Sequence, residues 1–214
     1  LGTNGGYNNN TQVFYYSGDK ESQDNIEWYT WNKTTKTNSW SDAELNTINL
    51  NTNYLNNLGS DWSNKIVTTT WQVGGNTLAK IGRTTMNLVY QNEVKTPATS
   101  TTYDAKIGLM YISDYGYAAD LSQCKQTLFN YDNSTCTANN WMKSIITNNG
   151  SNDGWLLTPA SGDARGAWYV YSSGDVSYND TSNSYGVAPV LSLTSELDIR
   201  SGTGTSSDPY QLNV

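Results

Sequence analysis

The sequence contains no histidine and only two cysteines. A chain without histidine has no Ser-His-Asp or Cys-His catalytic site, and it cannot bind a metal through imidazole. Two cysteines are also too few for the four-ligand set of a structural zinc site. We therefore expect no zinc or copper centre in this protein.

Charged residues are scarce as well, at 14% of the chain, and acids outnumber bases by 19 to 12. The net charge of −7 repels a phosphate backbone, and no cluster of lysine and arginine offsets it. Nucleic acid is therefore not an expected partner. No run of about 18 apolar residues is present, so we expect no membrane insertion by this segment. The sequence starts at Leu1 without a signal peptide, and we expect a leader or anchor outside it.

Neutral polar and aromatic residues are abundant: 27 Asn, 16 Tyr and 8 Trp in 214 residues. A disordered chain would have few aromatic residues and a high net charge. This chain is long enough to bury a substantial core without a metal. We expect a folded domain in which aromatic rings fill much of the core and their polar ends reach the surface.

Cys124 and Cys136 enclose a stretch that includes the polar sequence LFNYDNST. In an exported protein this pair predicts one disulfide, which would stabilise the fold by about 3 kcal/mol. The alternative is two reduced thiols in a cytosolic protein. The neutral, lysine-poor composition favours export, so we expect a disulfide and an extracellular or cell-surface location.

The first half of the chain predicts short helices and a few strands. Residues 1–12 are rich in Gly and Asn and predict a flexible lead-in, followed by a single α+β domain over residues 13–214. Residues 13–16 and 26–31 have the composition of strands. Ser41 and Glu44 have the spacing of a capping box at the start of a helix. The asparagines of residues 49–53 are expected to divide that helix into two pieces.

The rest of the chain predicts a hairpin, two helices and then a series of strands. The hairpin turns at Gly74-Gly75-Asn76. Residues 84–94 have apolar residues on one helical face, residues 106–113 predict a buried strand, and a short helix is expected around residues 139–146. Short strands follow from Trp155 onward and end with one at YQL. Helices in the first half and an antiparallel sheet in the second define an α+β fold.

Three ordered motifs carry a resemblance to a known family: WLLTP at residues 155–159, WYVYSSGDV at 168–176 and GVAPVLSL at 186–193. With further segments that extend the likeness to most of residues 26–214, they resemble an uncharacterised domain family of bacterial surface proteins. Many of its members are pilin-like proteins of Gram-positive gut bacteria. The resemblance implies a C-type-lectin-like fold of the formylglycine-generating-enzyme kind in the C-terminal part. Ala188 stands where this family usually has arginine.

Residues 166–180, GAWYVYSSGDVSYND, predict a β-hairpin. A two-residue turn at Ser173-Gly174 or Gly174-Asp175 places four side chains on one face because side chains alternate along a strand. These four are Tyr169, Tyr171, Val176 and Tyr178, whereas Trp168 and Val170 lie on the other face. In one interpretation the tyrosines form a second packed layer. In the other, Tyr169, Tyr171 and Tyr178 form an exposed platform on which sugar rings stack.

Acidic residues are concentrated in the same region. Residues 151–198 contain six acids and one base, Arg165. Calcium binds carboxylates and backbone oxygens of such loops. Tyr178-Asn179-Asp180 is similar to the Trp-Asn-Asp calcium motif of sugar-binding lectins, but the Glu-Pro-Asn or Gln-Pro-Asp partner of that motif is absent. Two interpretations of these acids therefore stay open: they bind calcium, or they are turn residues exposed to solvent.

The predicted ligand-binding residues are Tyr169, Tyr171, Tyr178, Asn179, Asp180 and Arg165. We expect an extracellular, non-enzymatic binding or adhesion module whose partner is a host or cell-surface glycan or protein. No cofactor is expected, apart from the open question of calcium. One alternative is a self-associating structural subunit of a pilus-like filament or surface layer. Another is a hydrolase that uses two facing carboxyl groups.

Overall fold

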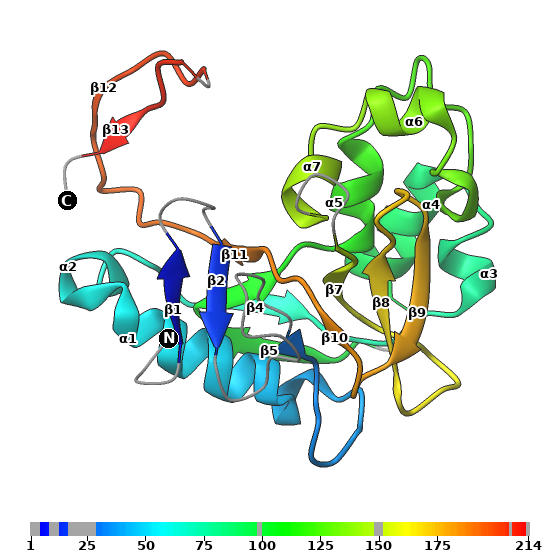
Figure 1. Ribbon diagram of the computed structural model, residues 1–214, viewed down its shortest axis with the longest axis horizontal. Coiled ribbons are helices and arrows are strands. Elements are labelled where there is room, and N and C mark those ends of the chain that lie inside the picture. Colours follow the sequence, from blue (N-terminus) through cyan, green and yellow to red (C-terminus); the bar gives the residue numbers. More distant parts are fainter. Residues whose placement is uncertain are drawn as a thin grey trace.

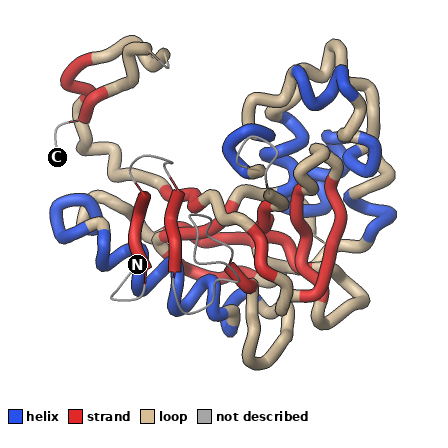
Figure 2. The backbone as a smooth tube through the Cα atoms, in the orientation of Figure 1, coloured by secondary structure: helices blue, strands red, loops and turns tan. Residues whose placement is uncertain are grey.

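The computed structural model describes residues 5–8, 13–16, 29–97, 100–147, 152–205 and 207–212. It is a mixed structure of short helices and small antiparallel sheets (Figures 1 and 2). In Figure 1 the helices α3 to α7 gather beside strands β7, β8 and β9, whereas α1 and α2 lie at the opposite end of the molecule. The expected C-type-lectin-like topology stays a prediction.

The helical segments follow in chain order. They are η1 (Trp40–Asp42), η2 (Leu45–Tyr54), α1 (Leu55–Asn57), α2 (Gly59–Ser63), α3 (Leu78–Ile81), α4 (Met86–Tyr90), η3 (Gln91–Lys95), α5 (Ile112–Tyr117), η4 (Leu128–Asn130), α6 (Ser134–Ala138) and α7 (Lys143–Ile146). Segments η1 and η4 are 3-10 turns, whereas η2 and η3 are π-helical.

Most strands pair with the next strand along the chain, and two pairings join strands that are distant in sequence. They are β1 (Gly5–Asn8), β2 (Val13–Tyr16), β3 (Tyr29–Thr30), β4 (Thr69–Gln72), β5 (Thr102–Ala105), β6 (Ile107–Leu109), β7 (Gly154–Pro159), β8 (Gly166–Val170), β9 (Val176–Asp180), β10 (Ser184–Tyr185), β11 (Pro189–Leu191), β12 (Ile199–Ser201) and β13 (Gln211–Leu212). The order β7-β8-β9 forms the one described sheet with three strands, and the others are the pairs β1-β2, β3-β10, β6-β11, β4-β5 and β12-β13.

Strands β7 and β8 are buried on both faces. Neighbouring side chains of a strand point to opposite faces of its sheet. Accordingly, Trp155 and Leu157 pack into one hydrophobic cluster and Leu156 into another, and Tyr169 and Trp168 divide in the same way. The three-stranded sheet therefore separates two hydrophobic cores.

The first cluster is dominated by tryptophan. Trp31 contacts Trp40 edge-on, with 4.9 Å between ring centroids, and Trp155 at 5.9 Å. Such edge-to-face pairs of buried rings add about 0.5–1.5 kcal/mol each beyond the area they bury. The second cluster contains Trp168, residues of α5 and the two cysteines. The sequence-based expectation of an aromatic core is therefore confirmed.

The helix expected after Ser41 forms with different ends. It begins at Leu45, with no side-chain cap, and it is continuous through α1, so neither the capping box at Ser41 nor the break at residues 49–53 is present. The asparagines are tolerated because they bond elsewhere. The side-chain amide of Asn51 donates to the carbonyl of Ile107 at 2.9 Å and accepts from its N–H at 2.9 Å. Asn51 thus binds the edge of β6 as a neighbouring strand would.

The hairpin expected at Gly74-Gly75-Asn76 is wrong. Strand β4 pairs with β5 further along the chain, and Leu78–Ile81 forms helix α3. The backbone of Asn76 instead accepts from Ser161 N–H at 2.8 Å and donates to the Pro159 carbonyl at 3.0 Å. A partner distant in sequence therefore displaces the local turn.

Other sequence predictions are confirmed in whole or in part. The expected helix at residues 84–94 forms as α4 and η3, and the helix around residues 139–146 forms as α7. Of the buried strand expected at residues 106–113, Ile107–Leu109 forms β6, whereas Ile112 and Ser113 begin helix α5. The C-terminal strands form as β7, β8, β9, β11 and β13. Within the expected lead-in, Gly5–Asn8 forms β1 and pairs with β2. The strand expected at residues 26–31 is described only from Tyr29 onward, and Tyr29–Thr30 forms β3.

Glu93 is a carboxylate at the centre of the fold, only 2% exposed. It accepts hydrogen bonds from Ile112 N–H at 3.0 Å and Ser113 N–H at 2.8 Å, and from the Thr158 hydroxyl. The first N–H groups of a helix have no partner within that helix, so Glu93 satisfies two of those of α5. It thereby links η3, α5 and β7. Burial raises the pKa of Glu93, although these hydrogen bonds oppose the increase.

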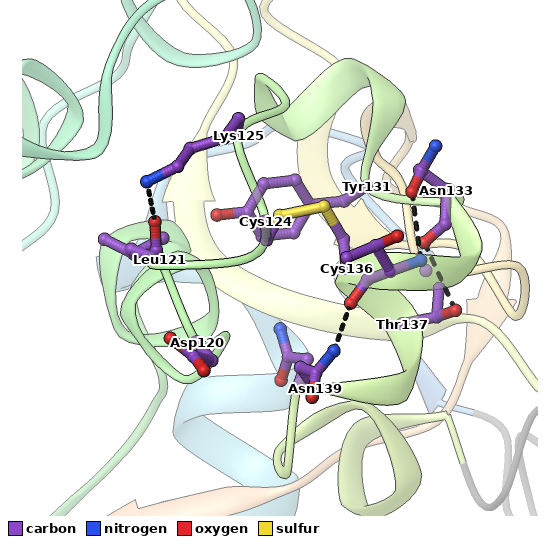
Figure 3. The surroundings of a disulfide bond; sticks show 12 residues. Asp120, Leu121, Cys124, Lys125, Tyr131, Asn133, Cys136, Thr137 and Asn139 are labelled. Atoms are coloured by element: carbon purple, nitrogen blue, oxygen red, sulfur yellow. Dashed lines mark hydrogen bonds between the residues drawn. A yellow bond between two sulfur atoms is a disulfide. The ribbon is translucent and has the colours of Figure 1, made fainter.

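The expected disulfide joins Cys124 and Cys136, whose Cα atoms are 4.6 Å apart. Both cysteines are buried, and Figure 3 shows the bond beside the ring of Tyr131. The Tyr131 hydroxyl donates to the carbonyl of Gly116 in α5 at 3.0 Å. The disulfide therefore fastens a loop with little regular structure to the second core.

We expect the double substitution Cys124→Ser with Cys136→Ser to lower the unfolding free energy by about 3 kcal/mol, because the open loop has more entropy in the unfolded chain. Urea unfolding with and without a reductant measures this. The reductant should destabilise the wild type and leave the double variant unchanged. Equal stabilities of the oxidised wild type and the variant would contradict the expectation.

Glu93→Gln should lower the unfolding free energy by about 1–3 kcal/mol, because the amide places N–H groups against backbone N–H donors. The loss should depend on pH. Since the pKa of Glu93 is raised above 4.5 in the folded state, its proton stabilises the fold fully below pH 4.5, and this contribution is lost as pH rises through the raised pKa.

The stability difference between wild type and Glu93→Gln should therefore narrow as pH increases from 4.5. Urea unfolding of both proteins across a pH series checks this, and titrations common to both cancel in the difference. A gap that widens with pH would show that the pKa of Glu93 is lowered instead.

Candidate functional site

The turn between β8 and β9 is longer than the sequence predicts. Val170 pairs with Val176 and Trp168 with Tyr178, so the loop contains the five residues 171–175. Gly174 has a φ of 113°, which glycine adopts without strain, and its N–H donates to the Tyr171 carbonyl at 2.8 Å. A one-residue change in register moves every β9 side chain to the other face. Tyr178 therefore shares a face with Trp168, and the predicted arrangement of the tyrosines is wrong.

The three tyrosines of the predicted platform also differ in how much of each side chain is exposed. Tyr169 is 1% exposed, whereas Tyr171 is 37% and Tyr178 is 39% exposed. Tyr171 lies against Tyr169, with ring centroids 4.6 Å apart, and Tyr178 lies against Trp168 at 5.4 Å. The two exposed rings are thus on opposite faces of the hairpin, and a single platform of three tyrosines does not exist.

The remaining predicted residues divide between the same two faces. The Arg165 guanidinium pairs with Asp180 at 2.5 Å on the Tyr178 face. Slight burial acts to raise the pKa of Asp180, but hydrogen bonds from Ser182 and the charge of Arg165 lower it overall. On the other face, the Asn179 amide donates to the Tyr185 hydroxyl at 2.8 Å.

Tyr185 replaces Tyr178 as the third aromatic residue of this face. It comes from β10 and stacks on Tyr169, with ring centroids 4.5 Å apart and planes 22° apart. We call Tyr169, Tyr171, Tyr185 and Asn179 the tyrosine cluster. Burial raises the pKa of Tyr169 and of Tyr185, so both hydroxyls are protonated donors at neutral pH. No local pattern in the sequence places Tyr185 here, because its position depends on pairing between β10 and β3.

A groove of about 570 Å³ opens elsewhere on the surface. It lies between residues 38–41, residues 73–75 with 101–103, and the loop 159–164 that joins β7 to β8. Four segments thus meet around one space. The groove could not be predicted from the sequence, because these segments come together only in the folded chain.

Asn38 holds one wall of the groove in place. Its side-chain amide donates to the carbonyls of Ala160 at 2.9 Å, Asp163 at 2.8 Å and Gly166 at 2.8 Å. Its backbone N–H donates to the Ala164 carbonyl at 2.8 Å. Asn38 therefore reinforces the loop between β7 and β8, which also has backbone hydrogen bonds of its own from Ala160 to Gly166 and from Gly166 to Asp163.

The groove is polar and almost uncharged. Serine, threonine and glycine residues line it together with the aromatic residues Trp40 and Tyr103 and a few small apolar residues, and Asp163 is the one carboxylate among its described lining residues. One carboxylate oxygen of Asp163 accepts from Arg165 N–H at 3.0 Å, and the Arg165 side chain turns away to Asp180. The lining therefore offers many hydrogen-bond donors and acceptors and a single negative charge.

The described residues contain no group of three or more acids or cysteines that would hold a metal ion. No described helix is long and apolar enough to cross a membrane.

The chain matches a protein family over most of its length. Residues 20–195 correspond to a domain of unknown function, DUF6273, and the chain belongs to this family. Comparison with curated proteins gave no match, and comparison with solved structures gave none either.

We expect Asn38→Ala to lower the unfolding free energy by about 1–3 kcal/mol, because the Ala160 carbonyl loses its donor and the Asp163 and Gly166 carbonyls keep only a backbone donor each. Amide hydrogen exchange should quicken in the loop 160–166. Asn56→Ala is the matched control, since Asn56 is exposed on α1, and it should change stability by less than about 0.5 kcal/mol. Unchanged exchange in the loop of Asn38→Ala would show that other contacts hold this wall.

Proposed function

We propose that this domain is a non-enzymatic binding module of an exported bacterial surface protein, and that its groove binds a neutral glycan. The observation that carries the proposal is the polar groove with hydroxyls, backbone groups, one tyrosine ring and one carboxylate. Sugars present hydroxyls that both donate and accept, which such a lining complements. A carboxylate such as that of Asp163 can accept two of them in charge-assisted hydrogen bonds.

The same groove favours binding over glycoside hydrolysis. Hydrolysis requires two carboxyl groups about 5–10 Å apart on either side of the bond. Asp163 has no second carboxyl group opposite it among the described lining residues. Glu93, the carboxylate with raised pKa in the core, is buried in hydrogen bonds with the backbone and does not line the groove.

The location of the protein is part of the proposal. Disulfides such as Cys124–Cys136 are typical of exported proteins because the cytosol keeps thiols reduced. The resemblance of the C-terminal motifs to surface and pilin-like proteins supports display on the cell surface, and so does the expected lectin-like topology. Host or cell-surface glycans would then be the accessible partners, and self-association in a filament stays an alternative.

A panel of neutral and anionic oligosaccharides on an array, followed by calorimetry, tests the proposal. We expect a neutral oligosaccharide to bind without being cleaved. Asp163→Asn keeps the acceptor for Arg165 N–H but removes the charge, and it should weaken binding by about 1–2 kcal/mol. Asp132→Asn is the matched control, because Asp132 is exposed and does not line the groove.

Release of shorter sugars on prolonged incubation would contradict a purely binding role. Equal binding by Asp163→Asn and Asp132→Asn would show that the ligand does not occupy the groove.

A further inference from the structure

The tyrosine cluster presents aromatic rings to solvent outside the groove. Tyr171 is 37% exposed, Asn179 is exposed and Tyr185 is partly exposed, and none of them lines the groove. A monomeric protein usually covers such rings or uses them. This face meets the solvent beside strands β7 and β8, which are buried on both faces, so the cluster requires an explanation of its own.

The rings of the cluster are fixed before any ligand arrives. Tyr185 contacts Trp155 and Tyr169, each at 4.5 Å between ring centroids, and its hydroxyl is held by Asn179. The Tyr171 ring contacts Tyr169 at 4.6 Å, and its backbone N–H donates to the Asp175 carbonyl at 2.8 Å. Residues that are already ordered lose little conformational entropy when they bind a ligand.

The polar groups around these rings complement hydroxyl groups. Asn179 and the tyrosine hydroxyls supply donors and acceptors at the edge of the rings. Asp153 interacts electrostatically with Tyr169 and Tyr185, and one of its carboxylate oxygens accepts from Ser172 N–H at 2.8 Å. Asp175 adds a second carboxylate near Asp153. Two acids beside the cluster repel an anionic ligand and admit an uncharged one.

We propose that the tyrosine cluster is a second carbohydrate site, which binds one ring of a neutral hexose-containing glycan on Tyr171 and Tyr185. The apolar C–H face of the sugar lies on the tyrosine rings, and its hydroxyls bond to Asn179 and the phenols. This arrangement uses both the apolar body and the polar end of tyrosine. Glycans with sialic or uronic acids are disfavoured by Asp153 and Asp175.

The hairpin supplies a matched control for the test. Tyr178 has nearly the same exposure as Tyr171, 39% against 37%, and also lies against a buried aromatic ring, but on the opposite face. Tyr171→Ala should weaken binding of a neutral oligosaccharide at this site roughly tenfold, or about 1.4 kcal/mol. Tyr178→Ala should leave it unchanged, and Tyr171→Phe should retain most of it because the ring remains.

Two-dimensional NMR separates this site from the groove. We would titrate the wild-type domain and the three tyrosine variants with neutral gluco-, galacto-, manno- and N-acetylhexosamine oligosaccharides, and with sialyl and uronate oligosaccharides. For a neutral oligosaccharide, the Asn179 side-chain amide and the backbone amide of residue 171 should shift, and in Tyr171→Ala these shifts alone should require roughly tenfold more ligand. Shifts of the Asn38 side-chain amide report the groove independently.

The proposal is overturned if no neutral oligosaccharide shifts the Asn179 amide, or if Tyr171→Ala and Tyr178→Ala bind equally. It is also overturned if the anionic sugars bind the cluster more tightly than the neutral ones. Loss of the Asn38 shifts with retained Asn179 shifts would refute only the groove as a glycan site. The opposite result would refute only the second site.

Discussion

Strands β7 and β8 have apolar side chains on both faces, and each face must pack against another part of the protein to be shielded from water. The tryptophan cluster covers one face, with Trp155 and Tyr169 as its contribution from the sheet. Residues of α5 and the disulfide loop cover the other and pack on Trp168. Because both layers depend on the same two strands, neither core is complete without the sheet. Glu93 reinforces this dependence, since it bonds to β7 and to the start of α5 at once.

The same sheet determines where ligands can reach the protein. Both faces of β7 and β8 are covered, so accessible surface remains at the strand ends and on β9. The loop leaving β7 forms one wall of the groove, which Asn38 holds by three hydrogen bonds. At the hairpin, Tyr169 is buried in the core. The rings of Tyr171 and Tyr185 pack against its ring and are partly exposed to solvent. The core and the two candidate sites thus share residues, which gives both sites a rigid base.

Elements with a strong local pattern could be predicted from the sequence, such as the buried strand β6 and the cysteine pair. Elements whose partners are distant could not. The glycines at positions 74 and 75 suggest a turn, yet Asn76 bonds to the end of β7 instead. Which face each β9 side chain occupies depends on whether the hairpin loop has one residue more or fewer, and composition does not specify that length. The groove and Tyr185 were missed because both assemble only in the folded chain, the groove from four segments and Tyr185 through the pairing of β10 with β3.

A crystal structure of the domain saturated with the neutral oligosaccharide that binds it most tightly would test the central claim most directly. The account predicts intact sugar in the groove beside Asp163 and Tyr103, and a sugar ring on Tyr171 and Tyr185. Sugar bound at neither place, or a cleaved product in the groove, would contradict it.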